Sequence, residues 1–193
     1  MLGLKLPTDP RWVNIVKKNI EEILTDHAYC EQKAASMAIS LIIGFPEKPE
    51  LVKAMVALSR EEMGHFNMVH EKILERGWVL GRERKDQYVI ELKKFFPKGG
   101  SRETHLIHKL LYAALIEARS CERFRLLSEE INDKDLSKFY RDLMVSEANH
   151  YTMFLKFARQ YGDPKEVDQK WNALLEYEAE LMSTLGTKET MHG

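Results

Sequence analysis

The stretches Glu62-Met63-Gly64-His65 and Glu147-Ala148-Asn149-His150 decide how this sequence is interpreted. Both have the form Glu-x-x-His, and residues three apart in a helix lie on one face, about one turn from each other. Each stretch lies in the middle of a segment whose apolar residues have helical spacing. Two matches in corresponding places indicate acid and imidazole side chains that face a core. A third match, Glu189 to His192, lies close to the C-terminus and is set aside.

Helical spacing extends through most of the chain around these two stretches, and no alternating pattern indicates a strand. Glycine and proline mark the breaks, most clearly between Gly44 and Pro49. The pattern predicts helices over residues 9–43, 49–76, 86–95, 103–131, 134–161 and 163–185, and a frayed tail over residues 187–193. Two hairpins joined by a long connection are typical of one kind of helical bundle. We therefore expect an all-α, ferritin-like four-helix bundle. It has a long crossover between the second and third long helices, an additional C-terminal helix, and a single domain over residues 1–193.

Composition limits the classes of function. The chain has 193 residues with 29 Lys and Arg against 30 Asp and Glu, so its net charge of −1 gives no global field that would attract nucleic acid or a membrane surface. Two cysteines, Cys30 and Cys121, are too few for a disulfide scaffold. No apolar run is long enough for a membrane span or a secretory signal. We expect a cytoplasmic protein.

Two further carboxylates lie on the apolar stripes of the first helix in each hairpin. Glu31 follows Cys30 and Glu122 follows Cys121, so the two hairpins echo each other as a weak internal repeat. An ionised carboxylate in a core costs several kcal/mol unless a cation, a metal or strong donors accompany it. Glu117 is the main rival of Glu122, because it too falls on an apolar stripe. The repeat favours Glu122.

Four carboxylates and two imidazoles match the ligand set of ferritin-like proteins that hold two iron or two manganese ions. The predicted metal ligands are Glu31, Glu62, His65, Glu122, Glu147 and His150. Oxygen and nitrogen ligands of this kind suit iron or manganese. The pattern predicts a di-iron centre that uses dioxygen as co-substrate and draws electrons from an external donor, with no catalytic residue beyond the metal centre. The alternative is a ferritin- or rubrerythrin-like iron oxidase or peroxidase without an organic substrate.

Four blocks of sequence resemble one known family. They are Asp26-His27-Ala28-Tyr29-Cys30-Glu31-Gln32-Lys33-Ala34-Ala35, Arg60-Glu61-Glu62-Met63-Gly64-His65-Phe66, Glu117-Ala118-Arg119-Ser120-Cys121-Glu122-Arg123-Phe124 and Ser146-Glu147-Ala148-Asn149-His150-Tyr151. In this order they resemble the tRNA 2-methylthio-N6-isopentenyladenosine hydroxylases, the MiaE family, over residues 6–182. The resemblance implies a ferritin-like fold and dioxygen-dependent hydroxylation of the isopentenyl group on a modified adenosine beside the tRNA anticodon. It also implies the same six iron ligands, the tRNA anticodon loop as partner, and an unidentified reductase or electron-transfer protein.

The residues give partial support for an RNA partner. Residues 76–109 contain nine Lys and Arg against four Asp and Glu, so 9 − 4 gives a local charge of +5. This segment could follow a phosphate backbone, with Trp78, Tyr88, Phe95 and Phe96 available to stack on bases. A solvated loop with its aromatic rings packed beneath it explains the same composition, and the two interpretations stay open.

Overall fold

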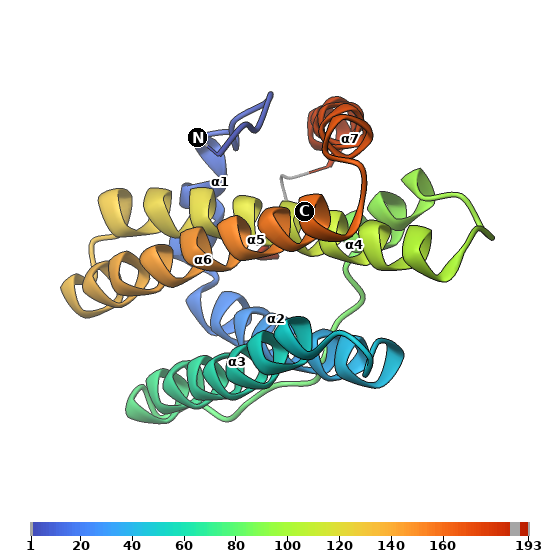
Figure 1. Cartoon of the computed structure of the whole chain (residues 1–193). Coiled ribbons are helices and arrows are strands. Elements are labelled where there is room, and N and C mark those ends of the chain that lie inside the picture. The colour runs from blue at the N-terminus through green and yellow to red at the C-terminus, as the bar shows by residue number, and fades with distance from the viewer. Residues whose placement is uncertain (1, 186–189, 193) are drawn as a thin grey trace. The chain divides into compact units, whose positions relative to one another are not determined.

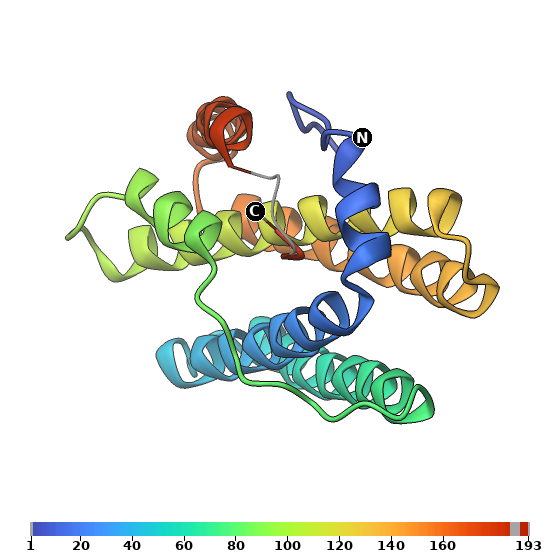
Figure 2. The same cartoon turned by 180° about the vertical axis from the view of Figure 1, so that it is seen from behind.

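The computed structural model describes residues 2–185 and 190–192, and these form helices joined by turns, with no strand among them. Figures 1 and 2 show the elements from opposite sides. In chain order they are α1 (Arg11–Lys18), α2 (Ile20–Gly44), α3 (Pro49–Glu75), α4 (Gln87–Leu92), the short 3₁₀ helix η1 (Lys93–Phe95), α5 (Arg102–Glu130), α6 (Lys134–Tyr161) and α7 (Pro164–Thr184). The chain divides into two compact units, residues 19–85 and residues 1–18 with 86–193. The prediction of an all-α fold is confirmed.

The unit of residues 19–85 is a hairpin of α2 and α3 (Figure 1). Its core is built from the buried side chains of Leu24, Ala28, Ala35, Ala38 and Leu41 on α2 and Leu51, Met55, Leu58, Val69 and Ile73 on α3. Gly77 ends α3 with a φ of +73°, and its N–H donates to the carbonyl of Leu74 over 2.9 Å. Only glycine adopts this left-handed conformation without strain.

After α3 the chain runs back in extended form along the hairpin (Figure 2). The hydroxyl of Tyr29 donates to the carbonyl of Gly81 over 2.9 Å. Two ion pairs also tie this segment to α2: Lys33 to Glu83 at 2.8 Å and Arg84 to Glu22 at 3.2 Å. The extended segment is therefore attached to α2 along its length.

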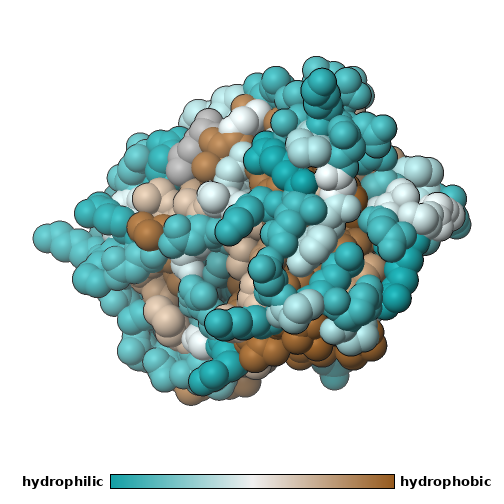
Figure 3. Space-filling view, viewed as in Figure 1, coloured by the Kyte–Doolittle hydropathy of each residue, from teal (hydrophilic) through white to brown (hydrophobic). Residues whose placement is uncertain are grey.

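The hairpin also exposes apolar side chains. Ile39, Ile43, Val56 and Met63 are all exposed large hydrophobic residues of α2 and α3. In Figure 3 brown surface gathers over these two helices at the lower edge of the view. The buried stripe of the hairpin is thus only part of its apolar surface.

The other unit is built on the hairpin of α5 and α6; α1 and α7 pack on this hairpin, and α4 packs on α7. Acidic and hydroxyl side chains cap its helices: Ser101 accepts from the N–H of Thr104, Asp133 from that of Leu136, and Asp163 from that of Glu166. Such residues satisfy backbone donors that the first turn of a helix leaves without partners. They fix where α5, α6 and α7 begin.

The expected single helix over residues 9–43 is wrong in one respect. The helix breaks at Asn19, whose φ of −137° and ψ of 42° are not helical, so α1 and α2 are separate helices. The side chains of Trp12, Val13 and Val16 on α1 are buried, and the ring of Trp12 lies 4.4 Å from the guanidinium carbon of Arg123 on α5. Helix α1 therefore packs on α5 and does not continue into α2 as one long helix.

The frayed end expected over residues 187–193 lies partly outside the described residues, which include only 190–192 of it. Met191 and His192 are buried there. The carbonyl of Thr190 accepts from Nη1 of Arg123 over 2.9 Å, and Nε2 of His192 lies 2.9 Å from Oγ of Ser120. Residues 190–192 are therefore held against α5, and for them the expectation of fraying is wrong.

Candidate metal centre

Three of the predicted ligands come together in the α2–α3 hairpin. Glu31 on α2 and Glu62 and His65 on α3 are buried, and each offers a ligand atom within 4.8 Å of those of the other two. Nδ1 of His65 lies 3.2 Å from Oε2 of Glu62 and 3.7 Å from Oε2 of Glu31. Their convergence follows from the Glu-x-x-His spacing on α3 and from the antiparallel packing of α2 beside it.

The electrostatics of this group favour a cation. Burial lowers the pKa of His65, but the carboxylates of Glu31 and Glu62 outweigh it and raise the pKa to about 10. Burial would raise the pKa of Glu31, yet contacts with His27 and His65 hold it below its usual range. A proton on His65 would offset one of the two negative charges. A divalent cation would take over that role and displace the proton, as metal binding to such ligands generally does.

His27 orients one of these ligands. It is fully buried on α2, one turn before Glu31, and its Nε2 lies 2.6 Å from Oε1 of Glu31. Hydrogen-bonding partners of this kind fix the direction of a ligating carboxylate. The sequence places His27 one turn before Glu31, but the hydrogen bond between them depends on the rotamers of both side chains.

The α5–α6 hairpin supplies a second group. Glu147 and His150 on α6 are buried, and Nδ1 of His150 lies 4.0 Å from Oε1 of Glu147. Glu117 on α5 is also buried, and a carboxylate oxygen of Glu117 lies within 4.8 Å of a ring nitrogen of His150. Cys121 lies one turn after Glu117 and is buried. Burial and the nearby Glu147 raise the pKa of its thiol to about 11, and its Sγ lies 3.4 Å from the carbonyl of Met144.

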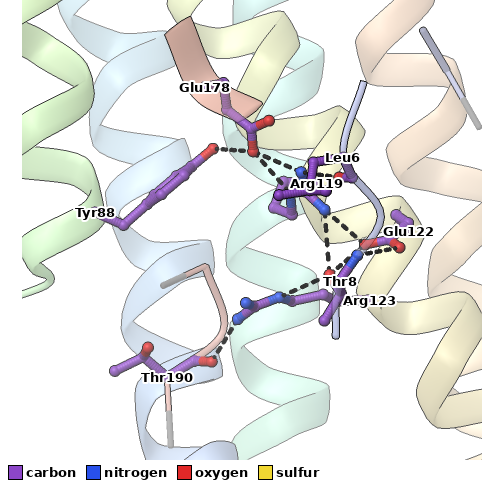
Figure 4. A network of polar contacts seen from close by, with 8 residues as sticks. All are labelled: Leu6, Thr8, Tyr88, Arg119, Glu122, Arg123, Glu178 and Thr190. Carbon is purple, nitrogen blue, oxygen red and sulfur yellow. Dashed lines mark hydrogen bonds and ion pairs between the residues drawn. The ribbon is translucent and has the colours of Figure 1, made fainter. Parts of the chain in front are cut away.

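Glu122 lies in a different environment (Figure 4). Its Oε1 accepts from the N–H of Thr8 over 2.9 Å, and its Oε2 accepts from the hydroxyl of Thr8 over 2.5 Å and from Nη1 of Arg119 over 2.9 Å. Arg119 is fully buried and also donates to Glu178 of α7 and to the carbonyl of Leu6. The charge of Glu122 is thus compensated inside the protein. This arrangement argues against the prediction that Glu122 is a metal ligand.

The network around Arg119 joins distant parts of the chain. Besides Glu122 it includes Glu178, which accepts from the hydroxyl of Tyr88 over 3.1 Å, and Arg123, which donates to Thr190. Tyr88 is fully buried, so of the two interpretations left open for residues 76–109, its ring fits packing beneath the segment and not stacking on a base. Buried ionic groups of this kind need complete pairing, and here a guanidinium joins the N-terminal segment, α5 and α7.

Comparison with known proteins identifies the relatives of this chain. A model of the family described as tRNA-(MS[2]IO[6]A)-hydroxylase (MiaE) matches residues 2–193. The chain belongs to the MiaE family. The resemblance found in the sequence is therefore confirmed, and the buried glutamate and histidine groups of this MiaE chain are consistent with a metal site.

Two curated relatives of this MiaE chain carry the name tRNA 2-(methylsulfanyl)-N(6)-isopentenyladenosine(37) hydroxylase. The protein from Pseudomonas putida KT2440 is 37% identical over 164 residues, which cover 85% of this chain and 78% of the relative. The protein from Salmonella typhimurium LT2 is 30% identical over an alignment that covers 93% and 83%. Both alignments cover most of either chain.

A solved structure, protein 43 with aldehyde deformylating oxygenase activity from Synechococcus, superposes with a TM-score of 0.91 at 32% identity. The match covers 98% of this chain and 95% of that one. It confirms the predicted ferritin-like fold. Among the described residues, no helix combines the length and the apolar character that crossing a membrane requires.

Proposed function

We propose that this MiaE chain hydroxylates the isopentenyl side chain of 2-methylthio-N6-isopentenyladenosine in the anticodon loop of tRNA, with dioxygen as co-substrate. The observation that carries the proposal is the family match over residues 2–193. The two buried groups of glutamate and histidine, on the helices where the sequence placed them, support it.

The metal in this proposal is a pair of iron ions. The α2–α3 and α5–α6 hairpins each carry one carboxylate helix and one Glu-x-x-His helix, and ferritin-like di-iron proteins use the same kinds of ligand. The proposed ligands are Glu31, Glu62, His65, Glu117, Glu147 and His150, with Glu117 in place of Glu122. Oxygen and imidazole donors suit iron, and the pair, when bound, supplies the activation of dioxygen.

The protein's own residues position ligands and exclude water. His27 holds Glu31 at 2.6 Å, and all six proposed ligands are buried. Exclusion of water strengthens the electrostatic interactions within a site and prevents side reactions. One oxygen atom enters the C–H bond and the other leaves as water, so each turnover consumes two electrons and two protons. An external reductase or electron-transfer protein supplies the electrons, because the chain has only two cysteines and the thiol of Cys121 is held protonated by burial.

Mass spectrometry of nucleosides tests the proposed reaction. Iron-loaded protein is incubated with tRNA that carries the prenylated nucleoside, a reductant and oxygen, and the nucleoside is expected to gain the mass of one oxygen. Glu31→Ala and His150→Ala should abolish the gain and lower the iron content per chain. Glu61→Ala is the matched control, since Glu61 is the exposed neighbour of Glu62. Absence of any mass gain with the unaltered protein would contradict the proposal.

Two other activities are distinguished in the same experiment. The relative with aldehyde deformylating oxygenase activity makes an aldehyde the natural competing substrate, and release of formate from an aldehyde measures it. An iron oxidase or peroxidase would consume oxygen or peroxide without any organic substrate. Oxygen consumption that depends on prenylated tRNA, with one hydroxylated nucleoside per oxygen, separates the proposed hydroxylase from both.

A further inference from the structure

The first half of α5 carries a line of basic side chains. Arg102, His105 and Lys109 are three and seven residues apart, so they project from one face of the helix, and all three are exposed. The residues around them on α5, such as Leu106, Ile107 and Leu110, are buried. This face therefore meets solvent in the first half of α5, and its three side chains extend over about 10 Å of helix axis.

Two lysines from other elements extend this line. Nζ of Lys93 in η1 lies 5.6 Å from the ring centre of Tyr112, which follows Lys109 by one turn. Nζ of Lys170 on α7 lies 3.0 Å from Nε2 of His108, the neighbour of Lys109. Lys93, Arg102, His105, Lys109 and Lys170 together are called the α5 basic face below.

Two acidic residues, Glu91 and Glu103, are close to this face in the sequence. Glu91 is paired with Lys94 at 2.7 Å, and Glu103 projects about 100° away from Arg102 around the helix. Burial lowers the pKa of His108, and the charges of Lys170 and His105 lower it further, with no carboxylate among the causes. Neutral His108 therefore accepts from Lys170, and the surroundings are positive although the chain has a net charge of −1.

Aromatic rings adjoin the α5 basic face. The ring centres of Phe96 and His108 are 5.0 Å apart, those of Phe95 and Phe96 are 5.1 Å apart, and those of Phe95 and Tyr177 are 5.4 Å apart. Phe95, Phe96 and Tyr177 are partly exposed. Proteins that bind single-stranded nucleic acid combine cationic groups, which follow the backbone, with aromatic rings on which bases stack.

We propose that the α5 basic face binds the phosphate backbone of the substrate tRNA. The proposal rests on the proposed function, which makes tRNA the partner, and it assigns the contact to particular residues of η1, α5 and α7. Arg102 and Lys109 lie at its centre and contact successive parts of the backbone, while the rings of Phe95 and Phe96 lie beside it. An anionic lipid surface would be attracted by the same charges, so binding to lipid vesicles is one outcome of the test below.

Binding of an anticodon stem-loop RNA tests this surface. The affinity of iron-loaded protein is measured by fluorescence anisotropy between 50 and 300 mM salt for the unaltered chain and for Arg102→Ala/Lys109→Ala. Each lost phosphate contact should reduce the slope of log K against log salt by about 0.7 to 0.9 and weaken binding roughly five- to eightfold at 0.1 M salt. The double variant is therefore expected to bind at least about 25-fold more weakly.

The chain offers a closely matched control. Lys134 is the first residue of α6, as Arg102 is of α5, and Arg141 follows it by seven residues, as Lys109 follows Arg102. Lys134 and Arg141 are exposed as well. Lys134→Ala/Arg141→Ala removes the same charge at the same spacing from another helix, and it should leave affinity and salt slope within about twofold of the unaltered protein.

Several results would overturn the proposal. Equal losses of affinity in both double variants would mean that net charge alone matters, and an unchanged affinity in Arg102→Ala/Lys109→Ala would exclude this face. If Arg102→Ala/Lys109→Ala lost binding to vesicles of anionic phospholipid but kept its affinity for RNA, the face would bind a lipid surface instead. Arg102→Lys/Lys109→Arg, which keeps the charges, should restore RNA binding and shows that folding is not the cause. Hydroxylation of tRNA by the unaltered protein is measured separately, so failure of the proposed function is distinguished from failure of this surface.

Discussion

The α2–α3 hairpin and the α5–α6 hairpin carry the same kinds of side chain, but they place their carboxylates differently. In α2 the glutamate after Cys30, Glu31, lies 3.7 Å from His65 of the Glu-x-x-His helix. In α5 the glutamate after Cys121, Glu122, is bound by Arg119 and Thr8. Glu117, five residues earlier, is the carboxylate close to His150. A local repeat in sequence therefore does not guarantee the same role in both halves.

The cause of this difference is visible three residues before each glutamate. Ala28 stands at this position in α2, whereas Arg119 stands there in α5. A guanidinium one turn away holds the carboxylate of Glu122 at 2.9 Å and orients it within the network of Figure 4. Alanine offers no such partner, so Glu31 is available to His27 and His65.

Separate substitution of the two α5 carboxylates gives the largest expected difference in activity and iron content. Glu117→Ala should lower hydroxylation of tRNA by more than about 100-fold and remove iron from the protein, because loss of a ligand exceeds the 10- to 100-fold cost of losing its hydrogen-bonding partners. Glu122→Gln should keep iron content and activity within a few-fold. Iron per chain and hydroxylated nucleoside are measured for both variants. The opposite pattern would restore Glu122 as the ligand and show that the halves are equivalent after all.

Most of the fold was predictable from the sequence, whereas the choice between Glu117 and Glu122 depended on a weak internal repeat. The bounds of α6, Lys134–Tyr161, agree with the prediction because Asp133 and Gly162 mark both ends chemically. The break at Asn19 was not predicted, since helical spacing continues through it and only packing of Trp12 on α5 separates α1 from α2. Glu122 and Glu117 both lie on apolar stripes. In the structure Glu122 is held by Arg119, three residues before it, and by Thr8, 114 positions away in the chain, and helical spacing shows neither contact.

Removal of the Arg119 guanidinium tests how much its buried ion pairs contribute to the stability of the α5–α6 unit. Arg119→Met leaves Glu122 and Glu178 buried without their common cation, and breaking a buried pair in this way costs about 3–5 kcal/mol. For a chain of this size the Tm should fall by roughly 6–20 °C. Lys138→Met is the control, because Lys138 forms an exposed pair with Asp142 at 2.6 Å, and such pairs contribute at most about 1 kcal/mol. Similar Tm values for the two variants would show that the network of Figure 4 does not stabilise this unit.

The contact of the C-terminal residues with α4 should depend on pH. Asp86 caps α4 through a 2.9 Å hydrogen bond from the N–H of Tyr88, and its Oδ2 lies 3.5 Å from Nδ1 of His192. Burial would raise the pKa of Asp86, but His192 and the backbone donors lower it below 3.8. A carboxylate with a lowered pKa stabilises the folded state above pH 3.8, and this contribution is lost as the pH falls through the folded-state value.

Asparagine caps a helix about as well as aspartate, so Asp86→Asn should lower stability by no more than about 1 kcal/mol at pH 7, through loss of the charge that faces His192. The difference in Tm between this variant and the unaltered protein should stay constant down to about pH 5 and shrink below pH 4. Asp163→Asn, at the corresponding cap of α7, is the matched substitution for the cap alone. A difference in Tm that persists unchanged to pH 3 would mean that the charge of Asp86 contributes nothing to the attachment of residues 190–192.

The smallest expected effect concerns the two Glu-x-x-His helices themselves. Gly64 stands before His65 on α3, and Asn149 stands at the corresponding position before His150 on α6. A Cβ added at Gly64 would meet no atom within 4 Å, so Gly64→Ala should gain only helix propensity, about 1 kcal/mol, which thermal unfolding measures. Asn149→Ala should gain less, a few tenths of a kcal/mol, because asparagine is a better helix former than glycine. If Gly64→Ala instead lowered iron content while Asn149→Ala did not, the α2–α3 half would need backbone freedom beside His65 that the α5–α6 half does without. The two halves would then differ in how they admit metal as well as in where their carboxylates lie.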